Sequence, residues 1–196
     1  MVSHGDDDHS GGAKSLLAYA KVNKILTSVP NKFLQGAKFC QQGMHWHWDG
    51  VDFQMLHPPS HAAYWGNESS CVLKITSQGH RILLTGDIEY GAEQTLVRTL
   101  PKQLVADILV VPHHGSKTSS SEAFLDLIKP KIALFSTGYH NRYHHPHPQV
   151  VERYRQRSVK CYDTAVDGAI TLKLSAQKKP AIETYRQRYR AFWQVN

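Results

Sequence analysis

The start of this chain is crowded with imidazole and carboxylate side chains, the groups that bind divalent metals. The segment His4-Gly5-Asp6-Asp7-Asp8-His9 carries several of them within six residues. Alternate residues of an extended segment point to the same side, so we expect His4, Asp6 and Asp8 to converge and His9 to join them as the chain enters a helix. The alternative is an acidic loop exposed to solvent.

A single carboxylate follows an apolar stretch in Leu84-Thr85-Gly86-Asp87-Ile88. The lack of a side chain at Gly86 would let a metal or substrate come close to the backbone there. An aspartate in this setting is also a common turn or helix N-cap. Taken alone, Asp87 is therefore a weak candidate ligand.

A third motif, Pro112-His113-His114-Gly115-Ser116-Lys117, follows the next apolar segment. Its imidazoles suit metal binding, while its hydroxyls and ammonium group suit phosphate binding. A serine-rich helix cap with bystander histidines is the alternative.

The fourth motif is Asn141-Arg142-Tyr143-His144-His145-Pro146-His147-Pro148. Its two prolines restrict the loop and could fix the directions of His145 and His147, unless the motif is only a surface cluster of histidines. A further His- and Trp-rich segment, residues 45–49, is interpreted as a partly buried loop or strand edge and not as a site.

The elements that must position these motifs alternate along the chain. Strands are expected over 24–28, 37–41, 51–56, 71–76, 80–84, 107–111, 132–136, 159–162 and 169–174, and helices over 13–23, 89–100, 121–128 and 148–157. Hairpins that give way to strand–helix alternation predict a layered α/β or α+β sandwich with a mixed sheet. Three of the motifs lie at the ends of apolar strands, so the pattern predicts a metal centre on loops at one edge of the sheet.

Composition is that of a globular chain: of 196 residues, 41% are hydrophobic and 20% charged. No stretch of about 18 uncharged apolar residues is present, so we expect a soluble piece. The net charge is +7, of which +6 lies in residues 150–196, with 10 basic against 4 acidic residues. Such a basic end suggests a polyanionic partner, or else a solubilising tail. The three widely spaced cysteines predict neither a disulfide framework nor a thiolate zinc site.

Together the motifs resemble a known family. The first resembles the H-x-H-x-D-H signature of the metallo-β-lactamase fold, with Asp6 in place of the second histidine. With the Asn67–Leu73 and Thr85–Ile88 segments and the two later His motifs, the pattern resembles the C-terminal metallo-β-lactamase-like domain of ComEC/Rec2 competence proteins, the inner-membrane channels for DNA uptake. The resemblance covers residues 1–175 and leaves 176–196 as a basic C-terminal tail.

The resemblance implies an αββα sandwich with a two-metal site bridged by Asp87. The implied metal ligands are His4, Asp6, Asp8, His9, Asp87 and His145. Because this set has fewer imidazoles and more carboxylates than a typical zinc site, manganese is as plausible as zinc.

Further roles follow from the same resemblance. Asp8 would orient the nucleophile, and His113 would be a ligand or the proton donor to the leaving group. Ser116 and Lys117 would hold phosphate oxygens, Lys117 also in a catalytic role. Asn67 and Asn141 would complete the substrate site.

The implied function is a metal-dependent phosphodiesterase that degrades the DNA strand not imported during natural transformation, as part of a longer inner-membrane protein. Two alternatives stay open: a glyoxalase-like or lactamase-like hydrolase of small molecules, and a non-catalytic, metal-stabilised module that binds DNA. In the resembled fold several strands precede the first motif, whereas here it begins at His4. We therefore expect a C-terminal fragment that lacks the first strands of its N-terminal sheet and is prone to aggregate.

Overall fold

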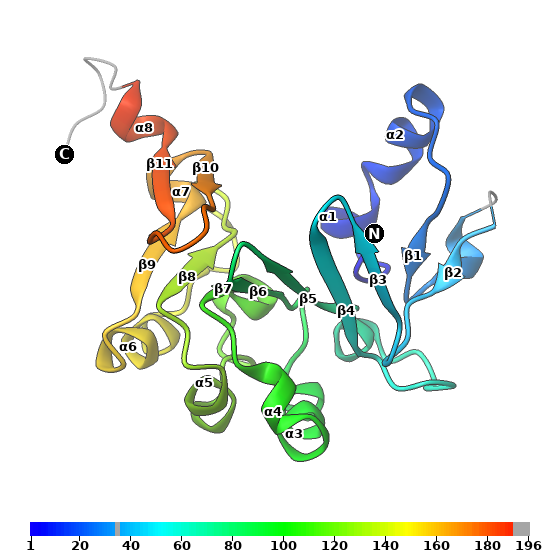
Figure 1. The fold of residues 1–196 in the computed structure, drawn as a ribbon, viewed down its shortest axis with the longest axis horizontal. Helices are drawn as coiled ribbons and strands as arrows, with labels where there is room; N and C mark the ends of the chain where they lie inside the picture. The colour runs from blue at the N-terminus through cyan, green and yellow to red at the C-terminus, as the bar shows by residue number, and fades with distance from the viewer. Residues whose placement is uncertain (34–35, 190–196) are drawn as a thin grey trace.

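A seven-stranded mixed sheet forms the centre of the protein in a computed structural model that describes residues 1–33 and 36–189 (Figure 1). Its spatial order follows the sequence. The strands are β3 (His45–Trp48), β4 (Val51–His57), β5 (Val72–Ser77), β6 (His80–Leu84), β7 (Ile108–Val110), β8 (Ile132–Phe135) and β9 (Lys160–Asp163). Neighbours from β3 to β6 are antiparallel, and those from β6 to β9 are parallel.

This mixed topology brings several loops to one edge of the sheet. Leu84 at the end of β6 pairs with Leu73 near the start of β5 and with Val110 at the end of β7. Val110 in turn pairs with Leu134 near the end of β8. The segments after β4, β6, β7 and β8 therefore all leave the sheet at the same edge, as the motifs predicted.

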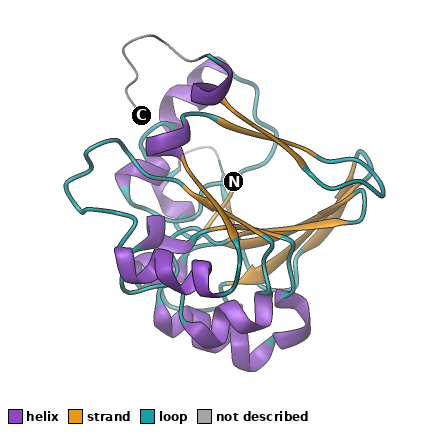
Figure 2. Cartoon of the chain, turned by 90° about the vertical axis from the view of Figure 1, so that its left-hand side faces the viewer, coloured by secondary structure: helices purple, strands orange, loops and turns teal. Residues whose placement is uncertain are grey.

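One face of the sheet is covered by helices (Figures 1 and 2). These are α3 (Tyr90–Thr99), α4 (Pro101–Leu104), α5 (Glu122–Ile128) and α6 (Pro148–Gln156). Their buried side chains, such as Leu96, Phe124 and Tyr154, form one core with Leu83 and Leu109 of the sheet. The side chains of β7 and β8 that face these helices are fully buried: Leu109, Ala133 and Phe135. None of the described helices is long and apolar enough to cross a membrane.

The opposite face packs against the N-terminal segment. Val2 bridges to Thr27 in β1 (Leu26–Thr27), which runs parallel to β2 (Lys38–Phe39). This small sheet shares a second buried cluster with the large one: Leu26, Cys40, Met55, Cys71 and Leu73. The predicted sandwich of a mixed sheet and helices is thereby confirmed.

Most of the predicted elements are present, with a few corrections. The helix expected over 13–23 is α2 (Ala13–Tyr19), and the segment at residues 45–48 is β3 at the edge of the sheet, as interpreted. The first motif is not extended throughout, because residues 7–10 form a helical turn, α1 (Asp7–Ser10).

The C-terminal part contains more structure than the sequence indicated. After α7 (Thr164–Asp167), β10 (Ile170–Lys173) pairs with β11 (Ala181–Thr184), and α8 (Tyr185–Arg188) follows. The predicted division between 1–175 and 176–196 falls inside this hairpin, and the domain assignment stays a prediction.

A disulfide joins Cys40 to Cys71, so the expectation of no disulfide is wrong. Both cysteines are fully buried in the second cluster, with their Cα atoms 6.0 Å apart. They are 31 residues apart and follow no recognisable spacing, so their contact depends on the packing of the two sheets. The bond ties the end of β2 to the start of β5, where the Cys71 amide donates to the Ser3 carbonyl oxygen at 2.9 Å.

We predict that the double variant Cys40→Ala/Cys71→Ala has a free energy of unfolding lower by roughly 2–4 kcal/mol, because the bond closes a loop in the unfolded chain. Urea unfolding measures the difference. Cys161→Ala is the matched control, since Cys161 is a free cysteine. An unmutated chain that unfolds at the same urea concentration with and without a reductant would contradict the prediction.

Candidate metal centre

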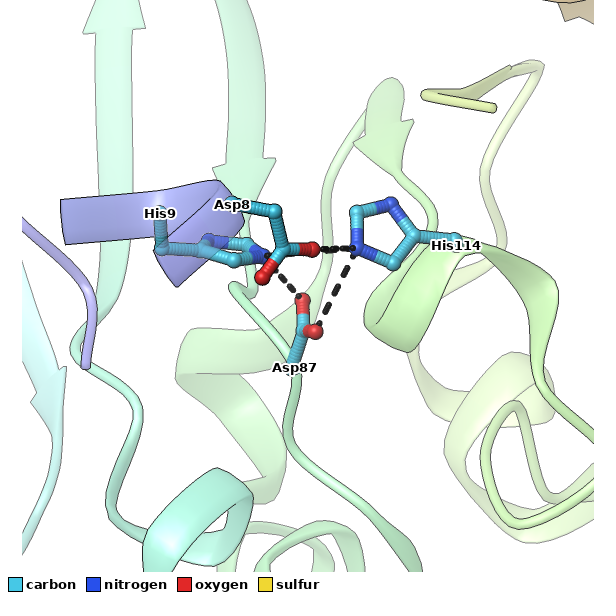
Figure 3. Close-up of side chains that lie close together, drawn as sticks. All are labelled: Asp8, His9, Asp87 and His114. Carbon is cyan, nitrogen blue, oxygen red and sulfur yellow. Dashed lines mark hydrogen bonds and ion pairs between the residues drawn. The ribbon is translucent and has the colours of Figure 1, made fainter. Parts of the chain in front are cut away.

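Four side chains from three segments converge at the loop edge of the sheet (Figure 3). Asp8 and His9 come from α1, Asp87 from the turn after β6, and His114 from the turn after β7. Each offers a ligand atom, and these atoms lie within 4.8 Å of one another. Two carboxylates and two imidazoles form a donor set that suits a divalent metal.

The distances show that both imidazoles face the same point. The His9 Nε2 atom is 3.1 Å from Asp87 Oδ1, and the His114 Nε2 atom is 3.4 Å from Asp87 Oδ2. His114 Nε2 also lies 3.1 Å from Asp8 Oδ2 and 3.3 Å from His9 Nε2. Asp87 therefore bridges the two rings, with one oxygen near each.

Contacts behind the two rings fix their direction. The Nδ1 atom of His114 donates to the Ser136 carbonyl oxygen at 2.6 Å, and His9 Nδ1 lies 2.9 Å from the Ser3 hydroxyl. Partners of this kind on the far nitrogen are typical of metal-binding histidines, because they leave the other nitrogen free for the metal.

The turn that carries Asp87 depends on the absence of a side chain at Gly86, whose φ is +55°. A Cβ there would lie 2.8 Å from the Ser70 Cβ and 2.9 Å from the Ser3 Cβ. Gly86 thus admits two neighbouring chain segments rather than a metal or substrate. The Ser70 hydroxyl accepts a hydrogen bond from the Asp87 amide at 3.0 Å and so holds the turn.

The turn that carries His114 is left-handed at successive residues. His113, His114 and Gly115 have φ values of +48°, +55° and +80°. This conformation is unfavourable for side chains other than glycine, so surrounding contacts must hold it. The buried Glu93 carboxylate provides one of them, since it accepts the amides of Ser120 and Ser121 at the end of this loop.

Asp87 and His114 form an ion pair within the cluster. Burial alone would raise the pKa of Asp87, but hydrogen bonds from His114 and His9 outweigh it and hold that pKa far below its usual range. The same hydrogen bond to Asp87 raises the pKa of His114 to about 9. A metal must displace the proton on His114, so metal binding should release a proton near neutral pH.

His4 and Asp6 lie beside the cluster of four. His4 is fully buried, and burial lowers the pKa of its ring. Its Nε2 atom has no hydrogen-bond partner among the described residues and lies 3.7 Å from Asp6 Oδ2. The His4 and His9 rings are 4.3 Å apart. A buried nitrogen without a partner is costly, and a second metal between His4 and Asp6 would satisfy it.

His145, another predicted ligand, is not in the cluster. Its ring centroid lies 5.8 Å from that of His113, and its Nδ1 atom is buried without a hydrogen-bond partner in the described chain. His113 is 3.0 Å from the Glu89 carboxylate, and the Asn67 side-chain amide contacts both groups at 3.4 Å. Asn67 therefore positions His113 and Glu89.

The other residues predicted to bind substrate differ in their exposure and in the contacts that they make. The Ser116 side chain is buried and bonds the Thr118 hydroxyl at 3.0 Å, whereas Lys117 is exposed. The Asn141 amide closes its own loop: it donates to the carbonyl oxygens of Gly138 and His145 and accepts the His145 amide. Direct substrate contacts of these residues stay predictions.

His114 was not among the ligands predicted from the sequence. The predicted residues were His113 of the same pair, as a ligand or proton donor, and His145 of a later loop, as a ligand. The Pro-His-His-Gly run indicated that this motif supplies a metal ligand. Which of the two rings reaches Asp87 depends on the left-handed turn.

A pocket of about 670 Å³ opens above the cluster. Its walls come from the first motif on one side and the loop after β8 on the other. The lining residues are Asp6, Asp7, Asp8, Asp87, His113, His114, Arg142, Tyr143 and His145. A substrate can therefore reach the metal-binding atoms from solvent.

In the metal-free protein we predict that the His114 ring titrates near pH 9, and that in Asp87→Asn its pKa falls toward the ordinary value of about 6.5. Because folding raises the pKa of His114, the His114–Asp87 pair contributes its full stabilisation to the folded chain below a pH of about 6.5. This stabilisation is lost as the pH rises through about 9. Proton NMR of the ring against pH measures the pKa, with Asp52→Asn as the control. A His114 pKa near 6.5 in the unmutated metal-free chain would contradict the arrangement.

This chain and its fold are similar to known proteins of one family. The profile described as the metallo-beta-lactamase superfamily matches residues 1–140. A proposed metal-dependent hydrolase from Parabacteroides distasonis has a similar fold, with a TM-score of 0.56, 16% identity, and coverage of 84% of this chain and 74% of that one.

Several relatives are more similar in sequence. Competence protein ComA of Neisseria gonorrhoeae is 36% identical over 196 residues, which are 99% of this chain and 27% of that protein. Recombination protein 2 of Haemophilus influenzae is 40% identical over 171 residues, 87% of this chain and 21% of that protein. ComE operon protein 3 of Bacillus subtilis is 34% identical over an alignment of 184 positions that covers 87% of this chain and 24% of that protein.

The chain spans about a quarter of the length of these relatives. The family profile covers most of the chain, and the relatives are those that the motifs predicted. The chain therefore belongs to the metallo-beta-lactamase superfamily, and its resemblance to the ComEC/Rec2 competence proteins is confirmed.

Proposed function

We propose that this chain is a metal-dependent phosphodiesterase that cleaves DNA. The observation that carries the proposal is the convergence of Asp8, His9, Asp87 and His114 on one point at the floor of an open pocket. The superfamily supports hydrolysis, and the names of the competence relatives support DNA as the substrate.

The donor atoms fit two divalent metals. Asp8, His9, Asp87 and His114 would hold one, and His4 with Asp6 would hold the other. Bound there, the metals would lower the pKa of a coordinated water and stabilise charge on the attacked phosphate. Carboxylates make up half of these ligands, so manganese fits as well as zinc.

The chain's own residues would orient the reacting groups. Asp8 has an exposed carboxylate at the pocket and can accept a proton from the nucleophile. His113 also lines the pocket, and Glu89 and Asn67 hold it in place, so it can donate a proton to the leaving oxygen. Lys117, on the exposed surface of the same turn, would contact phosphate oxygens.

The biological role follows from the relatives by analogy. One relative is named a competence protein, and this chain would form the nuclease part of such a protein, degrading the strand that is not imported. The remainder of a full-length protein would form the channel in the inner membrane. The buried Cys40–Cys71 disulfide supports a position on the oxidising side of that membrane, since disulfides persist there.

The basic C-terminal residues are a further part of this proposal. Arg186 donates to the carbonyl oxygens of Ala165 and Val166, and Arg188 pairs with Glu183. These contacts occupy part of their hydrogen-bonding capacity, but their charge can still attract a DNA backbone. Arg190 would act with them and lies outside the described residues.

Incubation of the pure chain with labelled single- and double-stranded DNA in Mn²⁺, Zn²⁺, Mg²⁺ or EDTA tests the proposed activity. We predict cleavage with at least one metal and none in EDTA. We expect Asp8→Asn and Asp87→Asn each to lower turnover by at least about 100-fold, because even changes in the residues behind metal ligands cost about 10–100-fold.

The control for these variants is Asp52→Asn, which removes an exposed carboxylate that pairs with His47 on the β3–β4 hairpin. It should cleave DNA as the unmutated chain does. DNA bound in EDTA without turnover in any metal would instead favour the non-catalytic module. Hydrolysis of small esters or amides without cleavage of DNA would favour the small-molecule hydrolase.

A further inference from the structure

Exposed aromatic side chains gather on the loops at the edge of the sheet that carries the metal centre. The described chain has nine strongly exposed tyrosines and tryptophans, and five of them follow β4, β6 or β8 at this edge. These five are Tyr64, Trp65, Tyr90, Tyr139 and Tyr143. Since exposed aromatic rings cost free energy in water, their gathering on the side of the sheet that carries the pocket points to a ligand with flat, apolar faces.

Tyr143 forms part of the pocket wall and is 62% exposed. Its ring stacks on that of His145, with centroids 5.8 Å apart and planes inclined by 20°. The Arg142 guanidinium lies 4.7 Å from the Tyr143 ring centroid. Arg142, Tyr143 and His145 thus form one stacked group beside the metal-binding atoms.

The loop that presents this group is held in place before any ligand binds. The Asn141 side chain bonds the backbone of His145 in both directions, at 2.7 and 2.8 Å. A ring held in this way loses little conformational freedom when a ligand stacks on it, which favours binding.

A second aromatic group lies against the first motif. The Tyr64 hydroxyl accepts the Gly5 amide at 3.2 Å, next to the residues of the opposite pocket wall. The neighbouring Trp65 is 76% exposed, and its amide donates to the Ser69 hydroxyl at 2.7 Å. Aromatic surface is therefore present beside both walls of the pocket.

Charge alone does not explain how a nucleic acid would be held here. The pocket is lined by four aspartates, and Arg142 is the only lysine or arginine that lines it among the described residues. Before metals bind, these carboxylates repel a phosphate backbone. Stacking of bases on aromatic rings is worth about 1–3 kcal/mol per base and does not depend on charge.

We propose that the Arg142–Tyr143–His145 group is a stacking site for an unpaired base, with Trp65 as a second site, and that the substrate of the metal centre is a single DNA strand. This inference rests on the proposed function and names its substrate. The bases of a duplex are stacked on one another, so their faces cannot reach these rings. The platform therefore selects a separated strand next to the cleavage site.

Binding without cleavage tests this inference directly. Fluorescence anisotropy in EDTA compares a labelled thymidine oligonucleotide, an abasic oligonucleotide of the same length, and a duplex. The two single strands carry the same phosphates and differ only in their bases. We expect the thymidine strand to bind at least about tenfold more tightly than the abasic strand.

The tyrosine is tested with two substitutions and a control. Tyr143→Ala should weaken binding of the thymidine strand about tenfold without affecting the abasic strand, whereas Tyr143→Phe should keep the affinity because the ring remains. Tyr19→Ala is the matched control, since Tyr19 is an exposed tyrosine on α2. Circular dichroism of each variant verifies folding.

Equal binding of the thymidine and abasic strands by the unmutated chain would overturn the inference, and so would the absence of measurable binding in EDTA. Neither result depends on a variant. If the strands are discriminated but DNA is not cleaved in any metal, the proposed activity fails and the stacking site stands. If DNA is cleaved without discrimination, the stacking site alone fails.

Discussion

The close approach of three chain segments at Gly86 is the constraint on which the metal centre depends. Ser3 and Ser70 cross Gly86 so tightly that a Cβ there would lie within 2.9 Å of each. Each serine then acts on a different ligand. The Ser70 hydroxyl accepts the Asp87 amide, and the Ser3 hydroxyl contacts the His9 ring. One crossing therefore sets the positions of two groups that are 78 residues apart along the chain.

The disulfide lies directly beneath this crossing. Cys71 follows Ser70, and its amide donates to the Ser3 carbonyl oxygen, so the residue that bonds Cys40 also holds the strand that leads into His4. The Ser28 hydroxyl donates to the same carbonyl oxygen at 2.9 Å. The first motif is thus attached to the large sheet through short contacts in a buried cluster. The Cys40–Cys71 disulfide at this place therefore stabilises the fold and also limits the movement of the candidate metal centre.

The sequence predicted the strands and helices well where local patterns determined them. The hairpin over residues 71–84 has alternating strands around Gln78-Gly79, and the helix that begins at Pro148 has the residue expected at a helix start. The α1 turn was missed because its conformation follows from tertiary contacts: Lys32 donates to both the Ser10 hydroxyl and the Gly5 carbonyl oxygen. The disulfide was missed because a pairing across two sheets leaves no spacing pattern.

The choice between His113 and His114 shows most clearly where inference from the sequence ends. In an extended or helical segment, neighbouring side chains point in different directions that can be deduced from the period. Two successive left-handed residues break that period. Here the turn directs His114 toward Asp87 and His113 toward Glu89, so adjacent imidazoles serve different carboxylates. Under the proposed function, one ring would bind metal and its neighbour would move a proton, and the unfavourable backbone at residues 113 and 114 would separate the two roles.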